Sequence, residues 1–189
     1  YGNSAVHGED EYYGEKARSS DKPRVEKTKY ADWNTDAIVT YLYLWQTTDD
    51  DRYKSMAEKS LDFFSKNMIV GEKVNPSSMG FNNLTHLPSN PPNQGVYHYI
   101  KEDGTKGVTG SLLDNAYLLL AFVEGYEVLG DEEYLAAAKK IADFSLERLY
   151  DWNSGGFFER NSPDTALYAA GDHIRLTKPM QENAIITNA

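Results

Sequence analysis

The stretch LLDNAYLLLAFVEGYEVLGDEEY, residues 112–134, decides the fold, because ADWNTDAIVTYLYLWQTTDDDRY at residues 31–53 repeats its pattern. The copies lie 81 residues apart, and identical residues recur at this offset: Asn34 and Asn115, Asp50 and Asp131, Tyr53 and Tyr134, Ala57 and Ala138, Asp62 and Asp143, Phe63 and Phe144. Each copy predicts an apolar helix, an acidic turn and an amphipathic helix. A duplicated helical hairpin buries its apolar face against its own copy. The pattern therefore predicts an all-α protein of the α/α toroid type.

The periodicity places the helices of the first hairpin at about 33–46 and 51–68, and the first helix of the second hairpin at about 111–129. Gly130 fits the end of that helix and Asp131 fits the N-cap of the next one. The first helix of each hairpin is the more apolar, which predicts an inner ring of helices wrapped by an outer ring. Residues 1–29 show no helical period and form an irregular N-terminal segment, and residues 30–189 form the helical domain.

The segment between the hairpins, residues 69–110, cannot be one helix, because it carries Pro76, Pro88, Pro91 and Pro92. We expect irregular structure here, with a short strand at Val96–Ile100 before a turn at residues 102–104. A third hairpin is expected to begin at Met180, and the chain ends inside that helix. The sequence therefore suggests a fragment of a longer protein.

Composition excludes several classes of function. The net charge of −10 argues against nucleic acid and anionic membranes as partners, because both select basic surfaces. No apolar run approaches the ~18 residues that span a bilayer. The chain has no cysteine, which excludes disulfides, zinc–thiolate sites and a cysteine nucleophile, and which favours a cytoplasmic location. We predict no metal and no cofactor.

Several motifs resemble those of a widespread family of long, thioredoxin-domain-containing, spermatogenesis-associated proteins. The family's helical region begins with a W-N-G motif, which Trp33-Asn34 resembles, although Thr35 stands in place of the glycine. Four further stretches are similar to family motifs: Leu112 to Tyr117, Gly130 to Tyr134, Gly155 to Phe158, and Pro179 to Ala184, where Gln181-Glu182 replaces Ser-Gly. The resemblance covers about residues 20–189.

The resemblance implies a six-hairpin glycosidase-like (α/α)6 barrel, here a partial one. It implies a carbohydrate-active or sugar-binding domain that hydrolyses or epimerises a sugar-like substrate, if it is an enzyme. The partners implied are a sugar-like small molecule and the rest of the parent chain, a thioredoxin-like domain and further hairpins. The alternative is a non-catalytic helical scaffold that packs against such a domain or another protein. With hairpins missing, inner-helix residues such as Leu118 to Val123 would lack neighbours on one side.

Glycoside chemistry needs a proton donor and a base or nucleophile, and paired carboxylates supply both. The candidate catalytic residues at inner-helix ends and loops are Asp114, Glu159 and His98. The candidate substrate-binding residues are Trp33, Asn34, Asp32, Asn115, Tyr97, Phe158 and Glu182. If the site is functional, burial should raise the pKa of Asp114. The alternatives are that Asp32 and Asp114 cap helices, and that the recurring Asn34 and Asn115 fix turns.

Overall fold

The computed structural model describes residues 27–70, 95–160 and 177–189. The described residues are mostly helical, as predicted, and the predicted site residues all lie among them. The helices are α2 (Ala31–Thr48), α3 (Asp51–Asn67), α4 (Leu112–Leu129), α5 (Glu132–Arg148) and α7 (Met180–Asn188). The strands are β1 (Lys29–Tyr30), β2 (Tyr97–Ile100) and β3 (Lys106–Thr109).

The turns inside the two hairpins are built alike. Asp49 and Gly130 both adopt left-handed backbone conformations, with φ of 55° and 74°. The following aspartates cap the second helices, because the side chain of Asp50 accepts from Arg52 N and that of Asp131 accepts from Glu133 N. Each cap satisfies an amide that the helix itself leaves without a partner. The predicted roles of Gly130 and Asp131 are confirmed.

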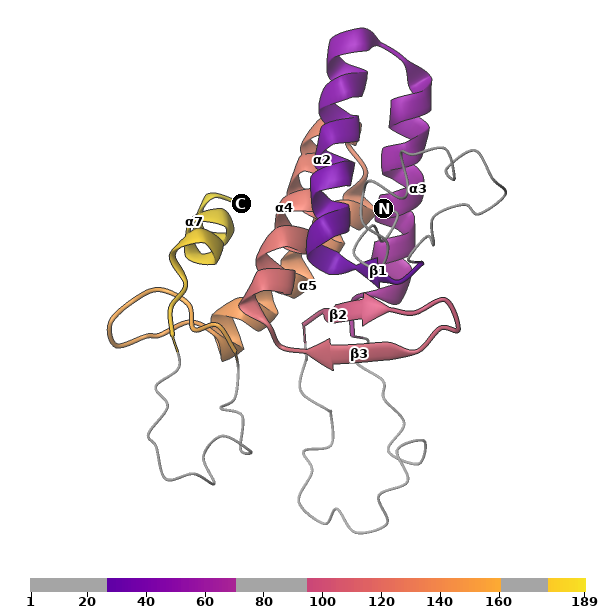
Figure 1. Ribbon diagram of the computed structural model, residues 1–189. Helices are drawn as coiled ribbons and strands as arrows, with labels where there is room; N and C mark the ends of the chain where they lie inside the picture. Colours follow the sequence, from indigo (N-terminus) through magenta and orange to yellow (C-terminus); the bar gives the residue numbers. More distant parts are fainter. Residues whose placement is uncertain (1–26, 71–94, 161–176) are drawn as a thin grey trace, which may run out of the picture.

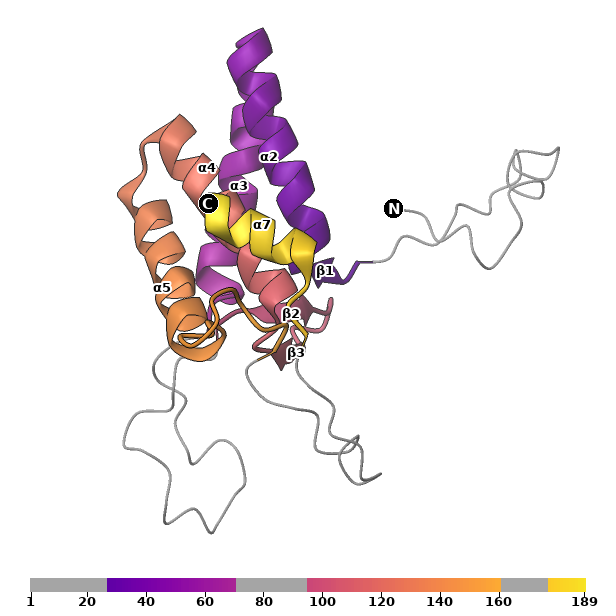
Figure 2. The same ribbon diagram turned by 90° about the vertical axis from the view of Figure 1, so that its left-hand side faces the viewer.

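The helices form two layers. The inner layer is α2, α4 and α7, with α4 packed between the other two, while α3 and α5 back α2 and α4 (Figures 1 and 2). An antiparallel sheet in the order β1-β2-β3 lies at the end of the molecule where α2 and α4 begin (Figure 1). This is part of an α/α toroid, with the N-terminal ends of the inner helices beside the sheet.

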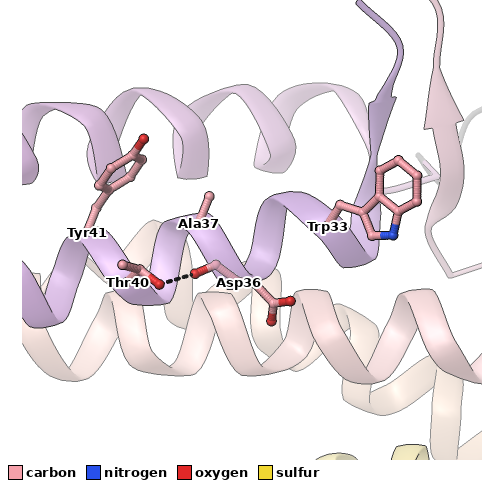
Figure 3. Close-up of a pocket in the computed structure, with 5 residues that line it drawn as sticks. All are labelled: Trp33, Asp36, Ala37, Thr40 and Tyr41. Carbon is pink, nitrogen blue, oxygen red and sulfur yellow. Dashed lines mark hydrogen bonds between the residues drawn. The ribbon is translucent and has the colours of Figure 1, made fainter. Parts of the chain in front are cut away.

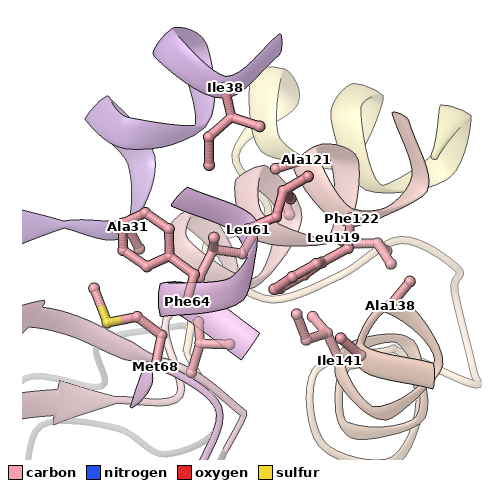
Figure 4. Packing of buried hydrophobic residues seen from close by; sticks show 14 of the residues in the cluster. Ala31, Ile38, Leu61, Phe64, Met68, Leu119, Ala121, Phe122, Ala138 and Ile141 are labelled. Carbon is pink, nitrogen blue, oxygen red and sulfur yellow. The ribbon is translucent and has the colours of Figure 1, made fainter. Parts of the chain in front are cut away.

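The core lies between the layers. Ile38 of α2, Leu61 of α3, Phe122 of α4 and Ile141 of α5 meet there and are almost fully buried (Figure 4). Burying one such side chain contributes roughly 1.5–3 kcal/mol relative to leaving it exposed. Contacts between copies of the repeat thus hold the hairpins together.

The open side of the inner layer differs from the expected one. Leu118 and Phe122 of α4 are fully buried, because α2, α5 and α7 surround that helix, so the expectation for residues 118–123 was wrong. The uncovered inner helix is α2, where Trp33 is 61% and Tyr43 57% exposed. The sequence pattern overstated the burial of α2, which is buried along one face.

The segments that leave the two hairpins also share one backbone arrangement. In the first, Val70 N donates to Gly95 O and Tyr97 N donates to Met68 O. In the second, Asp151 N donates to Gly156 O and Phe158 N donates to Leu149 O. Each segment then pairs back to the residue before its own inner helix, in the pairs Tyr30 with Tyr99 and Ser111 with Arg160. This equivalence places His98 and Glu159 at the same position of the repeat.

Candidate functional site

Three side chains meet where the sheet touches the inner helices. Asp32 belongs to the first turn of α2, Asp114 to the first turn of α4, and His98 to the middle of β2. The pairing of Tyr30 with Tyr99 holds β2 against the start of α2 and fixes His98 between the two helices. His98 Nδ1 lies 2.8 Å from Asp114 Oδ1, and one atom from each of the three residues falls within 4.8 Å of the others. We call these residues the mouth cluster.

The carboxylates of the mouth cluster are short of hydrogen-bond donors. Asp114 is fully buried, and its Oδ2 has no hydrogen-bond partner among the described residues. Asp32 Oδ1 is likewise buried and without a partner in the described part of the chain. Burial raises the pKa of Asp114; the hydrogen bond from His98 opposes the rise, and the charge of Asp32 adds to it. The expected direction of this pKa shift is confirmed.

The geometry argues against a capping role for Asp114. The N-cap of α4 is Ser111, and the Asp114 carboxylate interacts with the side chains of His98, at 2.8 Å, and Ser111. A capping aspartate would instead accept from backbone amides of its own helix. Asp114 therefore serves the cluster rather than the end of its helix.

Aromatic rings line one side of the cluster. The ring of Tyr30 lies 4.9 Å from that of Trp33 and 5.5 Å from the imidazole of His98, measured between centroids. The ring of Tyr99 lies 6.0 Å from His98. Exposed aromatic faces beside polar groups are typical of small-molecule sites. Tyr30 was not predicted from the sequence, because the pairing that brings it to His98 involves a strand of two residues, and Tyr99, which follows His98 directly in β2, was not predicted either.

Asn34 and Asn115 have structural roles. The side-chain amide of Asn34 donates to Tyr30 O at 2.7 Å, and that of Asn115 donates to Ser111 O at 2.6 Å. Asn183 of α7 donates to Pro179 O in the same way, at 2.7 Å. An amide that reaches the carbonyl four residues back thus recurs at the start of all three inner helices, which supports the alternative that these residues fix turns.

The remaining candidates make contacts with other groups. Glu159 Oε2 accepts a hydrogen bond from Thr177 Oγ1 at 2.5 Å. Lys178 Nζ lies over the ring of Phe158, 4.9 Å from its centroid. Tyr97 packs against the core, and Glu182 lies half-buried in the first turn of α7. Of the predicted residues, the structure thus brings together Asp32, His98 and Asp114, with Trp33 beside them through Tyr30.

A hollow of about 610 Å³ runs along the exposed face of α2. Its lining consists of Trp33, Asp36, Ala37, Thr40 and Tyr41 (Figure 3). Trp33 stands at the end nearest the strands, so the hollow leads away from the aromatic side of the mouth cluster (Figure 3). All five residues belong to one helix, which means that the hollow is open along its length.

The mouth cluster could also ligate a cation. Two carboxylates and an imidazole are ligand types used for divalent metals, and the 4.8 Å span brings one ligand atom from each residue near a common centre. The sequence analysis assigned no metal, because it found no His-x-x-x-His or calcium-loop spacing. Ligands drawn from three separate elements leave no such spacing in a sequence.

Comparison with known proteins identifies the fold. No family profile matches the sequence. The uncharacterised Caenorhabditis elegans protein B0495.5 is 24% identical over 150 residues, covering 77% of this chain but 18% of that protein. Among solved structures, the cellobiose 2-epimerase of Spirochaeta thermophila matches with a TM-score of 0.61 and 17% identity, over 88% of this chain and 38% of the enzyme.

Two more structures have the same architecture. A sugar epimerase from a ruminal bacterium matches with a TM-score of 0.56 and 18% identity, covering 74% of this chain and 31% of its own. A family 76 glycoside hydrolase (mannosidase) of Bacteroides thetaiotaomicron matches with a TM-score of 0.54 and 16% identity, covering 84% and 36%. The chain spans about a third of each of these structures. In the described residues, no helix is long and apolar enough to cross a membrane. The chain thus has the α/α-toroid fold of six-hairpin glycosidase-like enzymes, as a partial barrel.

Proposed function

We propose that this chain is part of a carbohydrate-active domain whose ligand site is the mouth cluster and its aromatic side. The observation that carries the proposal is the pair of half-buried His98 and fully buried Asp114, joined at 2.8 Å, at the start of the inner helices. Solved structures that share this fold include sugar epimerases and a mannosidase. The fold alone does not imply the activity, so the proposal depends on the site.

The pair is suited to move a proton. With Nδ1–H donating to Asp114 Oδ1, the other imidazole nitrogen of His98 is left as the base that faces a ligand. Asp114 fixes the orientation and tautomer of the ring, and it stabilises the imidazolium that forms. Proton transfer of this kind serves both reactions implied by the sequence, epimerisation at a carbon next to a carbonyl and hydrolysis of a glycosidic bond. Asp32 then supplies a second carboxylate beside the first.

The aromatic side supplies the binding platform. Trp33 is the most exposed of these rings, and it joins the cluster to the hollow along α2. A sugar ring stacked on Trp33 would place its polar edge toward His98. Among the candidate residues predicted from the sequence, Glu159 and Glu182 occupy the next repeat positions along the inner layer, and we propose them as secondary contacts for a longer saccharide.

The experiment is a turnover assay with cellobiose and mannan on the full parent chain. Asp114→Asn and His98→Gln should each lower turnover by roughly 10²-fold or more, the usual contribution of a positioned acid or base. Asp49→Asn is the matched control, because Asp49 is an exposed aspartate at the opposite end of α2 from Asp32. Equal turnover in all three variants would contradict the proposal.

The uncovered face of α2 favours a second candidate function, a helical scaffold. Trp33 and Tyr43 are exposed on this helix, and large exposed apolar side chains that gather on one face mark interaction surfaces. The partner would be a further hairpin or a thioredoxin-like domain of the parent chain. Tyr43→Glu should then weaken that association without altering the mouth cluster, and binding between separately purified parts would measure it.

A further inference from the structure

The mouth cluster contains two acceptors that need donors. Asp114 Oδ2 and Asp32 Oδ1 are both buried, and neither has a hydrogen-bond partner among the described residues. A buried acceptor without a donor is unfavourable, and a charged one more so. The group that completes this site should therefore offer hydrogen-bond donors to both oxygens at once.

The charge around these oxygens is negative. In the described part of the chain, neither Asp32 nor Asp114 forms an ion pair with a lysine or arginine, and the partner of Asp114 is His98. The carboxylate of Asp32 lies close enough to act on Asp114 as a like charge. A ligand with a carboxylate or phosphate at this point would be repelled, while a cation would be attracted.

We propose that the ligand of the mouth cluster is an amino sugar, whose protonated amine donates to Asp32 Oδ1 and Asp114 Oδ2. This inference rests on the proposed function, since it names the class of sugar for the same site. Two acceptors bound to one ammonium at about 2.8–2.9 Å lie ~4.6–4.7 Å apart for tetrahedral donors. One ligand atom of Asp32 and one of Asp114 lie within 4.8 Å of each other, so the two carboxylates are close enough to share one ammonium.

The aromatic side supports a cationic ligand as well. The rings of Tyr30 and Trp33 lie 4.9 Å apart between centroids, and that of Tyr30 lies 5.5 Å from His98, the partner of Asp114. An ammonium within about 6 Å of such a face is attracted by the electrons of the ring. Carboxylates and aromatic rings together select an amine over a neutral hydroxyl.

An amine fits better than a divalent metal. A zinc-type ion would need a further ligand besides the two carboxylates, and in this cluster that ligand is the imidazole of His98. The metal would also have to replace the 2.8 Å bond between His98 Nδ1 and Asp114 Oδ1 to use that nitrogen. An ammonium uses the two oxygens that have no partner and leaves this bond in place.

The test is calorimetric titration of the full parent chain with glucosamine, N-acetylglucosamine, glucose and glucuronate, at a pH where the amine is protonated. Glucosamine should bind roughly tenfold tighter than glucose or N-acetylglucosamine, the effect of one charged hydrogen bond, and glucuronate should bind most weakly. Asp32→Asn should remove the preference for glucosamine, and Asp49→Asn should keep it. The comparison with N-acetylglucosamine uses the unmodified protein, so it holds even if Asp32→Asn fails to fold.

The outcomes separate the two proposals. Equal binding of glucose and glucosamine, with both lost in Asp114→Asn, would overturn the amino-sugar inference and leave the proposed function intact. Failure of all four sugars to bind would contradict the inference, while turnover of cellobiose or mannan in the separate assay would still support the proposed function. Tight binding of Zn²⁺ or Mn²⁺ alone, lost in Asp32→Asn, would overturn the inference in favour of a metal site.

Discussion

The two segments that leave the hairpins, Gly95–Ile100 and Gly156–Arg160, have the same backbone pairing but opposite chemistry. In the first, His98 reaches two carboxylates that lack donors. Just before the second, Asp151 accepts from Lys178 Nζ at 2.6 Å, from the hydroxyl of Ser154 and from two backbone amides. The repeat thus builds the scaffold twice, and the buried side-chain oxygens without a partner in the described residues belong to Asp32, Asp114 and Asn115, beside the first segment. Unsatisfied groups in one copy of a repeat point to function there.

The two aspartates show the difference most directly. Burial raises the pKa of Asp114, while the hydrogen bonds from Lys178, Ser154 and Asn153 lower the pKa of Asp151. Asp151 joins the exit of the second hairpin to the segment before α7, so its chemistry stabilises the fold. The Asp114 carboxylate is buried with one oxygen that has no partner among the described residues, which makes it the candidate for the proposed function.

The largest expected effect comes from the glycines at the start of the two segments. Gly95 has φ of +73°, and an added Cβ would lie 2.4 Å from Asn115 Oδ1 and 2.7 Å from the ring of Phe144. Gly156 has φ of +78°, but its nearest contact would be 3.3 Å, to Asn183 Oδ1. Gly95→Ala should cost about 3–5 kcal/mol, from strain and overpacking together, and Gly156→Ala about 1–2 kcal/mol from strain.

Urea denaturation of the two variants measures this difference in the free energy of unfolding. Equal losses would show that the two segments do not differ in their packing against the next inner helix.

Asp114→Asn should stabilise the protein by about 1 kcal/mol at neutral pH, because it removes a buried charge that lacks donors. The folded protein holds the Asp114 proton more tightly than the unfolded chain, whose carboxyl pKa is about 3.9. The contribution of Asp114 to stability is therefore present below that value and is lost as the pH rises through the raised folded pKa. Thermal melts from pH 4 to 7 should show a gain that grows with pH, and a gain independent of pH would rule out this cause.

Asp151→Asn should have the opposite pH dependence and a smaller effect. The folded pKa of Asp151 is lowered, so its contribution is present above the unfolded value of about 3.9 and is lost as the pH falls below it. The variant should melt at a lower temperature at pH 7 and match the parent near pH 3. Lys178→Met, which removes the partner cation, should show the same profile, and a stable Lys178→Met protein at pH 7 would contradict the role of this pair.

The fold could be predicted from the sequence because its signals are local or repeated. The 81-residue repeat, Gly130 at the end of α4 and Asp131 as a cap depend on residues close in sequence, and each prediction is confirmed. The burial of α2 was overestimated, because its apolar residues reveal nothing about which neighbours the chain supplies. The burial of α2 depends on which helices pack against it, and that is not encoded in its own apolar pattern.

The site could be predicted only in part. Asp32, His98 and Asp114 were selected one at a time from residue type and position, but their meeting depends on the pairing of β1 with β2. Tyr97 was also predicted as a site residue, but its side chain packs against the core. Side chains alternate along a strand, so Tyr97 and its neighbour His98 face opposite sides. Asn115 shows the limit most clearly, since its amide bonds at a helix start while its buried Oδ1 has no partner among the described residues, so its role as a substrate contact stays a prediction.

The most direct test of the central claim, that the mouth cluster is the ligand site, is an NMR titration that follows the imidazole signals of His98. Adding the sugar bound most tightly should shift these signals, and Asp114→Asn should abolish or alter the shift because the ring loses its carboxylate partner. Asp151→Asn, which changes the carboxylate at the exit of the second hairpin, should leave the shift of the His98 signals unchanged. A sugar that binds the protein without moving the His98 signals would contradict the account.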